Sequence, residues 1–272
     1  MTATVQHKRS VFAELHREGC FVIPNPWDVG SAIALQGLGF KALASTSSGM
    51  AWAMGHADGE VKRATVLSHL HALAAAVDIP VNADFEGGFA DEPDAVADSV
   101  YLCVETGVAG LSIEDATGDP EQPLYDFTLA VERIAAARAA IGSSGVLLTA
   151  RSEGFIRNRP DMDETIRRLT AFAEAGADCL YAPGLRSETD IATVIRAVAP
   201  KPINILAPGL PVATLADLGA RRISVGGALA RTAWGEFLRA AKEIAEKGTF
   251  TAFERAAKGG ELNALFAGRQ ES

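Results

Sequence analysis

Eight short apolar runs rich in strand-forming residues recur along this chain of 272 residues, at a spacing of roughly 30 residues. They are Cys20–Pro24, Ala42–Ser45, Pro80–Asp84, Gly110–Glu114, Val146–Arg151, Asp178–Ala182, Ile203–Ala207 and Arg222–Val225. Apolar residues at helical spacing, such as Val66, Leu70 and Leu73, lie between most of them, and Asp161–Ala175 is another such stretch. Because strand and helix alternate throughout, at a length near the roughly 250 residues usual for that fold, the pattern predicts a (β/α)8 barrel of TIM type.

The chain continues well past the last predicted strand. We expect residues 1–272 to form one barrel domain, with 232–272 as a C-terminal helical extension. The apolar positions of this extension are Trp234, Phe237, Leu238, Ala241 and Ile244 on one helical face, followed by Phe250, Phe253, Leu262, Leu265 and Phe266. One helix is enough to finish a barrel, so the surplus apolar helix packs either on its own barrel or on a partner subunit.

Charge and composition exclude several classes of protein. Lys and Arg number 25 against 34 Asp and Glu, a net charge of −9, and no basic cluster is present, so nucleic acid is not an expected partner. The N-terminal residues are polar and no long apolar run occurs, which predicts a cytoplasmic protein without a membrane segment. Cys20, Cys103 and Cys179 are far apart, which disfavours disulfides and zinc. No G-x-S-x-G elbow or histidine triad pattern is present.

Carboxylates gather at the ends of neighbouring predicted strands. Asp84 and Glu86 end the third strand on one side of it, and Glu114 ends the fourth. Polar residues at the carboxyl ends of barrel strands face the active site, and such carboxylates repel one another unless a cation lies between them. Oxygen ligands suit Mg²⁺ or Mn²⁺, and Asp58, after the second strand, can supply a fourth. The sequence therefore predicts a magnesium site, the alternative being solvated acidic loops.

Local positive charge is expected from Arg151, which ends the fifth predicted strand. Its guanidinium would bind a substrate carboxylate or a developing oxyanion, or else pair with Glu114 or Glu153 without touching substrate.

Hydroxyl and amide groups at other strand ends complete the predicted site. Ser45, Thr46 and Ser47 precede a predicted helix and offer hydroxyls and backbone N–H groups to an anion. Gly226, after the eighth strand, either helps to hold an anion or allows close backbone approach. The remaining candidate substrate contacts are Asn25, Trp27, Asp28 and Asn204.

Together these strand ends resemble the isocitrate lyase and phosphoenolpyruvate mutase superfamily over residues 20–245. The segments that carry the resemblance are N-P-W-D-V-G-S-A (25–32), S-T-S-S-G-M-A (45–51), D-F-E-G-G-F (84–89), I-E-D (113–115), A-R-S-E (150–153) and P-I-N (202–204). The resemblance implies Mg²⁺ bound by the matching residues Asp84, Glu86, Glu114 and Asp58, partly through water. It implies that Arg151 and the N–H groups of 45–47 contact substrate. It also implies a last helix exchanged between subunits of a homo-oligomer, usually a homotetramer.

The chain departs from that family after the fourth strand. Isocitrate lyases carry K-K-C-G-H there, whereas residues 116–126 contain no Lys, Cys or His, and strand six ends in Pro183 and Gly184. The shared step that remains is cleavage of a 2-oxo acid through a metal-stabilised enolate, with oxaloacetate decarboxylation as the leading reaction and water or Tyr125 as the proton donor. One alternative is a C–C or P–C bond lyase or hydrolase that acts on a larger 2-oxo acid or phosphonate, a methylisocitrate lyase-like activity included. The others are a phosphosugar-type barrel enzyme that uses Gly226 and Gly227, and a catalytically silent metabolite-binding barrel.

Overall fold

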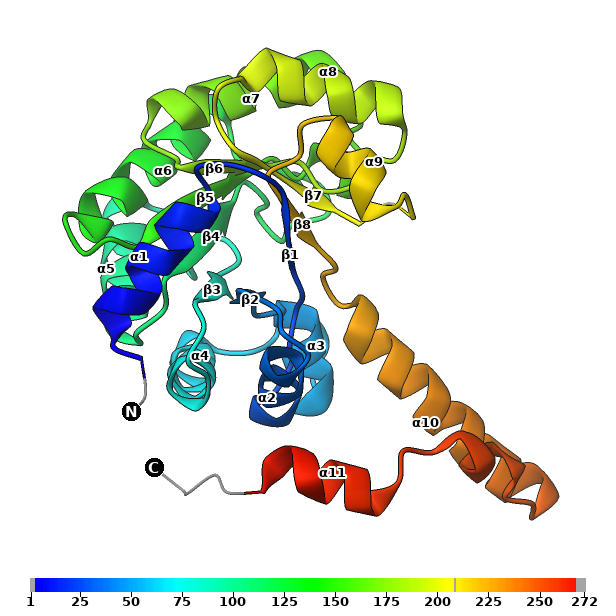
Figure 1. Ribbon diagram of the computed structural model, residues 1–272. Helices are drawn as coiled ribbons and strands as arrows, with labels where there is room; N and C mark the ends of the chain where they lie inside the picture. The colour runs from blue at the N-terminus through cyan, green and yellow to red at the C-terminus, as the bar shows by residue number, and fades with distance from the viewer. Residues whose placement is uncertain (1–2, 208, 268–272) are drawn as a thin grey trace.

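The computed structural model describes residues 3–207 and 209–267, and one sheet of eight parallel strands lies at its centre (Figure 1). The strands are β1 (Phe21–Ile23), β2 (Leu43–Ala44), β3 (Val81–Asp84), β4 (Gly110–Glu114), β5 (Leu147–Arg151), β6 (Cys179–Tyr181), β7 (Ile203–Leu206) and β8 (Arg222–Ser224). Each lies within one residue of its predicted ends. The order β1-β8-β7-β6-β5-β4-β3-β2 confirms the predicted barrel.

The barrel closes through β1. Phe21 pairs with Arg222 of β8, and the gap between β1 and β2 is bridged by a hydrogen bond from the Ala44 N–H to the Pro24 carbonyl at 3.1 Å. All residues of β4 are buried, because a parallel strand inside a ring of helices is covered on both faces. This is why the strands appear in the sequence as continuous apolar runs rather than as alternating ones.

Helices surround the sheet (Figure 1). Their buried apolar residues form one cluster with those of the strands. They are α2 (Val29–Gly37), α3 (Ser47–Ala53), α4 (Arg63–Ala76), α5 (Pro93–Glu105), α6 (Phe127–Ile141), η1 (Gly154–Ile156), α7 (Met162–Glu174), α8 (Glu188–Val198) and α9 (Val212–Asp217). The predicted helix at Asp161–Ala175 is confirmed as α7, with Asp161 as its N-cap. Leu169 and Phe172 of α7 are fully buried, as the helical spacing requires.

An additional helix, α1 (Val5–Leu15), packs at the amino-terminal end of the strands. Phe12 is fully buried with Ile23 and Ala109, and the ammonium of Lys8 donates to the carbonyls of Ala74 and Val77 at 2.7 and 2.5 Å. The polar sequence of this segment gave no signal for a helix. The buried ring of Phe12 and the hydrogen-bonded ammonium of Lys8 explain how a charged helix can cover the amino-terminal end of the barrel.

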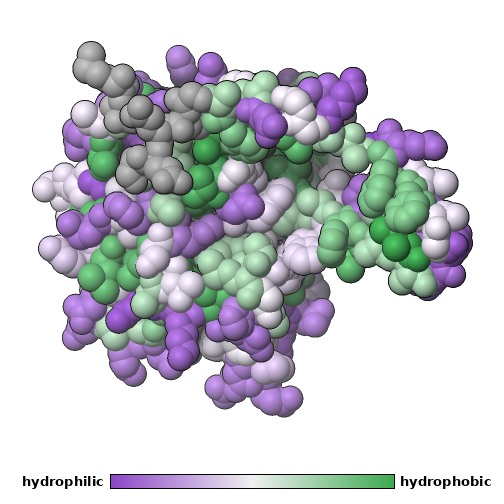
Figure 2. All heavy atoms as spheres, turned by 90° about the horizontal axis from the view of Figure 1, so that it is seen from below, coloured by the Kyte–Doolittle hydropathy of each residue, from purple (hydrophilic) through white to green (hydrophobic). Residues whose placement is uncertain are grey.

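After β8 the chain leaves the barrel as a long arm (Figure 1). The arm comprises α10 (Ala228–Lys247), η2 (Thr251–Arg255) and α11 (Gly259–Phe266). Ala230 is the one buried residue of α10. Figure 2 shows apolar residues gathered on the projecting arm. In the described part of the chain, no helix combines the length and apolar character needed to span a membrane.

The apolar residues of the arm remain largely uncovered. Phe237, Phe250 and Phe253 are each more than half exposed. Only the end of α11 returns to the barrel, where Leu265 and Phe266 lie beside Gly37 and Gly30 of α2. The sequence left two alternatives for the surplus helix, and within this single chain most of its apolar surface does not pack on its own barrel.

Candidate active site

Two adjoining cavities open at the carboxyl ends of the strands. The inner cavity has a volume of about 160 Å³ and the outer one about 640 Å³. Both are lined by Ser47, Asp58, Arg151 and Ile156, so they form one continuous site. This is the end of the barrel at which barrel enzymes carry their active sites.

Arg151 lies at the centre of this site. Its Nη1 is 2.7 Å from Asp84 Oδ1, its Nη2 is 3.2 Å from Glu114 Oε2, and its Nε is 2.9 Å from Glu153 Oε1. Glu114 and Arg151 are register partners on β4 and β5, which places the two side chains together. Burial lowers the pKa of Arg151, but Glu153, Glu114 and Asp84 outweigh it and raise that pKa well above its ordinary value. Arg151 therefore remains charged and bridges three carboxylates, both predicted pairing partners included.

Asp84 connects the arginine to the serine-rich loop. Its second oxygen, Oδ2, accepts a hydrogen bond from the Ser47 N–H at 3.0 Å, while its own N–H donates to Ser45 Oγ at 2.8 Å. Thr46 is the N-cap of α3, and its hydroxyl accepts from the Gly49 N–H at 3.3 Å. The structure thus brings together the predicted residues of β2, β3 and β5, with both Asp84 oxygens already occupied by donors.

The remaining acidic residues give the site an excess of negative charge. Burial, followed by Asp84, Glu114 and Asp58, raises the pKa of Glu86 to about 8. Burial and the neighbouring Glu153 raise the pKa of Glu114, and burial and Asp84 raise that of Asp58. Glu86 also has a positive φ of 50°, a conformation uncommon outside glycine. A divalent cation bound among these carboxylates would offset their mutual repulsion and favour their ionised forms.

The negative charge of the site would suit a bound cation, but the acidic side chains do not converge on a single point. Among residues 3–207 and 209–267, no three carboxylate, histidine or cysteine side chains converge closely enough to hold a metal ion. Asp84 is instead held by Arg151 and Ser47. Binding of a cation by Asp84 would therefore compete with Arg151 for the same carboxylate.

Three of the predicted substrate contacts line the inner cavity. Asn25 donates to the Ser45 carbonyl at 2.9 Å and accepts from the N–H groups of Val225 and Gly226, each at 2.9 Å. Asn204 accepts from Arg222 Nε at 2.8 Å. Asn25, Asn204 and Gly226 thus form cavity walls, and the amide of Asn25 is used to join β1 to β2 and β8.

Two predicted contacts lie outside the lining of both cavities. Asp28 is the N-cap of α2 and accepts from the Ser31 N–H at 2.7 Å. Trp27 packs beside Gly49 of α3. The structure gives both residues a local role at the start of helices, and their assignment as substrate contacts stays a prediction.

Tyr125 lines the outer cavity from a hairpin formed by residues 116–124. Its hydroxyl donates to Asp91 Oδ1 at 2.5 Å, and the Arg133 guanidinium lies 3.9 Å from its ring centroid. Burial and the hydrogen bond to Asp91 raise the pKa of Tyr125 to about 12. The phenolic proton is therefore engaged by Asp91 and held firmly.

Further ionic contacts surround the carboxylates of the site, and the sequence alone did not predict them. Asp115 accepts from the Glu153 N–H at 2.8 Å and pairs with Arg168 of α7 at 3.1 Å. Arg157, after η1, lies 3.3 Å from Glu114. Asp115 and Glu153 stand in the quoted I-E-D and A-R-S-E segments, so the motifs contained their signal. Arg157 and Arg168 lie in no quoted motif.

Fold and site together define a (β/α)8 barrel with an acidic, arginine-centred site at the carboxyl ends of its strands. The chain belongs to the phosphoenolpyruvate phosphomutase family, whose model matches residues 12–245. It is 38% identical over 221 residues to an uncharacterised protein of Mycobacterium tuberculosis, covering 79% of this chain and 81% of that protein. It is 29% identical over 224 residues to an oxaloacetate decarboxylase of Paraburkholderia xenovorans, covering 79% of this chain and 73% of that protein.

Solved structures agree with this family. A candidate lyase/mutase from Burkholderia cenocepacia is 46% identical and superposes with a TM-score of 0.93, covering 97% of both chains. A phosphonopyruvate hydrolase solved with oxalate and Mg²⁺ is 23% identical, with a TM-score of 0.84 over 97% of this chain and 95% of that one, and shows the shared fold.

Proposed function

We propose that this protein is a Mg²⁺-dependent carbon–carbon lyase that cleaves a 2-oxo acid through an enolate, with oxaloacetate decarboxylation as the leading reaction. The observation that carries the proposal is the set of acidic side chains Asp58, Asp84, Glu86 and Glu114, which line the two adjoining cavities around the buried Arg151. Family membership and the similarity to an oxaloacetate decarboxylase support it.

The residues that would hold the cation are Asp84, Glu86, Glu114 and Asp58. When bound there, Mg²⁺ would supply Lewis-acid stabilisation of the negative charge that develops on the substrate's oxo oxygen, and Mn²⁺ could replace it. The carboxyl groups with raised pKa would give up their protons on binding, because the cation favours their charged form.

The chain's own groups would bind and orient the substrate. Arg151 presents a fixed positive charge at the wall shared by both cavities. The backbone and hydroxyls of Ser45, Thr46 and Ser47 would hold the substrate carboxylate. Loss of CO2 needs no general base, and the enolate then needs one proton. We assign that proton to water, because the Tyr125 hydroxyl donates to Asp91.

A second candidate is cleavage of a larger 2-oxo acid at the same site. The outer cavity, at about 640 Å³, falls within the roughly 300–1,000 Å³ of pockets that enclose drug-sized ligands. Its size favours a substrate with a longer distal half.

A panel of 2-oxo acids assayed with MgCl2 and MnCl2 tests the proposal. We expect oxaloacetate to give pyruvate and CO2, with no activity in chelator. Turnover of only larger 2-oxo acids would support the second candidate. Binding of oxalate, an enolate mimic, without turnover of any acid would identify a silent barrel.

We further propose that the arm of residues 228–267 mediates assembly into a homo-oligomer, a dimer or tetramer. The exposed aromatic residues of the arm support this, because large uncovered apolar surfaces usually mark contacts. Exchange of the arm between subunits would bury these residues on a neighbouring barrel.

A further inference from the structure

One side of the outer cavity is formed by the hairpin within residues 116–126, which contains no Lys, Arg or His. The hairpin contributes Ala116, Thr117, Gly118 and Tyr125 to the lining. Asp91 and Glu60 add acidic groups beside it. If the end of a substrate that lies in the outer cavity is anionic, its partner must be a positively charged side chain on another part of the cavity wall.

Among the described residues, two arginines line the outer cavity, and they differ in their ion pairs and in their exposure. Arg151 contacts three carboxylates within 3.2 Å, and its side chain is 14% exposed. Arg157 is 41% exposed and lies 3.3 Å from Glu114 and 3.8 Å from Glu153. Both of its ion pairs are long, and its Nη1 makes no hydrogen bond within the described chain. Arg157 thus has more donors left for a ligand than Arg151 has.

The position of Arg157 also separates it from the carboxylates of β3. It follows η1 on the loop between β5 and α7, so it reaches the outer cavity but is not part of the inner one. A ligand with one end at Asp84 and Arg151 would point its other end into the outer cavity. Both partner carboxylates are buried, so a ligand is expected to use the free Nη1 of Arg157 and to leave the two ion pairs in place.

We propose that Arg157 is the specificity-determining residue of this site and selects 2-oxo acids that carry a second carboxylate at the far end. The inference rests on the function proposed above. A guanidinium offers a planar pair of donors that matches a carboxylate, and dicarboxylic 2-oxo acids therefore bind more tightly than acids of equal length with a neutral tail.

The test is calorimetric titration of the full-length protein in MgCl2 with three probes. Oxalate is too short to reach the distal group, whereas 2-oxoglutarate and 2-oxopentanoate have equal length and differ in the distal carboxylate. We expect the wild-type protein to prefer 2-oxoglutarate over 2-oxopentanoate by about tenfold, or 1.4 kcal/mol. Arg157→Gln should remove this preference, change oxalate affinity less than threefold, and leave 2-oxopentanoate affinity within twofold. Arg157→Lys should keep part of the preference.

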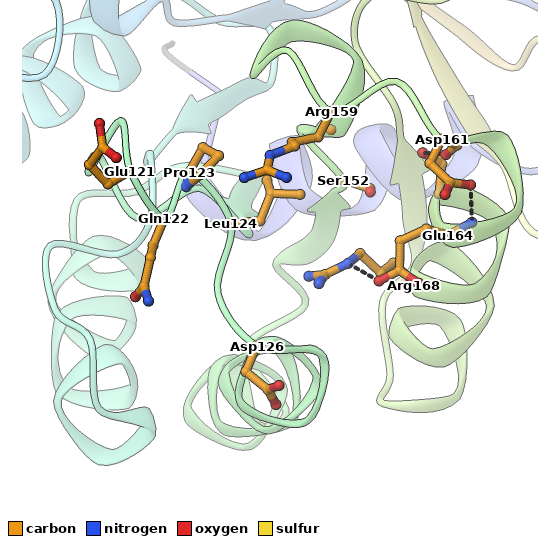
Figure 3. A pocket seen from close by; sticks show the side chains of 12 residues that line it. Glu121, Gln122, Pro123, Leu124, Asp126, Ser152, Arg159, Asp161, Glu164 and Arg168 are labelled. Carbon is orange, nitrogen blue, oxygen red and sulfur yellow. Dashed lines mark hydrogen bonds and ion pairs between the residues drawn. The ribbon is translucent and has the colours of Figure 1, made fainter.

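Arg159→Gln is the matched control. It removes one arginine from the same loop, but Arg159 lines a different cavity, of about 530 Å³, between Leu124 and α7 (Figure 3). It should leave all three affinities unchanged. If Arg157→Gln weakens both five-carbon acids equally, or neither, the assignment of Arg157 is wrong. If the wild-type protein binds no oxalate, the proposed function fails first and this inference with it.

Discussion

Asp84 and Arg151 form an ion pair of 2.7 Å at the mouth of the barrel, and the same carboxylate is a proposed metal ligand. The guanidinium of Arg151 thus already offsets part of the negative charge of Asp84, which a bound metal cation would also offset. Asp84→Asn should weaken Mn²⁺ binding at least about 100-fold, because changes to groups that only support metal ligands already weaken binding 10–100-fold. Calorimetry with MnCl2 checks this. Asp94→Asn, which removes an exposed carboxylate from α5, is the control. Full Mn²⁺ affinity in the Asp84 variant would refute its assignment as a ligand.

Arg151→Lys should lower kcat/KM for the best 2-oxo acid by about 10²–10³-fold, since an ammonium cannot replace a guanidinium that bridges three carboxylates. Steady-state kinetics with saturating MgCl2 measures the loss. Arg159→Lys makes the same substitution on the loop that follows β5 and should have no effect. Equal kinetics for Arg151→Lys and the wild type would remove Arg151 from the reaction.

His16 should make the fold sensitive to acid. Its Nδ1–H donates to the Phe12 carbonyl at 2.7 Å, so Nε2 faces Arg222 as the neutral acceptor at 3.4 Å. Burial, then Arg222, lowers the pKa of His16 to about 3. Between pH 6.5 and about 3 the unfolded chain binds more protons at this residue, so stability falls as the pH falls.

We expect His16 to account for about 2 kcal/mol of unfolding free energy lost between pH 7 and pH 5. Urea unfolding of the wild type and of His16→Gln at both pH values isolates this contribution, because all other titrating groups are common to the two proteins. An identical pH dependence in both would contradict the prediction.

Asn25→Ala should destabilise the barrel by about 2–4 kcal/mol, because one buried and two partly buried hydrogen bonds that join β1 to β2 and β8 are lost. Chemical unfolding measures the change. Asn263→Ala on the exposed face of α11 makes the same substitution and should lie within about 0.5 kcal/mol of the wild type. A loss as small as that of the control would show that the barrel does not depend on this amide.

The combined substitution Phe237→Glu and Phe253→Glu should reduce the mass of the particle in solution, since charges would enter the proposed contact between subunits. Light scattering coupled to gel filtration reports the mass, and the double substitution Lys242→Glu and Lys247→Glu on α10 controls for added charge. A wild-type protein that is monomeric would refute the assembly proposal.

The sequence predicts the features of this molecule that depend on residues close together in the chain, and it does not predict contacts between distant ones. The strands were placed within one residue, because burial on both faces gives each of them an uninterrupted apolar run. The site residues on β2 to β5 were found because strand ends converge in a barrel. The pairing of Arg151 with Asp84, two strands away, depends on side-chain packing that periodicity does not report.

Other features had weak local signals. Asn25 and Asp28 remain predicted substrate contacts, and the sequence did not show the structural roles that they also have. The Asn25 amide hydrogen-bonds to backbone groups after β2 and after β8, which are distant in sequence, and Asp28 caps α2. Helix α1 went unassigned because its burial rests on Phe12, while its lysine is satisfied by carbonyls that only the folded chain supplies.

The arm has one buried residue, Ala230, and follows the last strand of the barrel. During synthesis all eight strands have therefore been translated before the arm is complete, so the ring can close while the ribosome is still adding the C-terminus. Association of chains would then be a later event, controlled by the concentration of finished barrels rather than by the folding of each one.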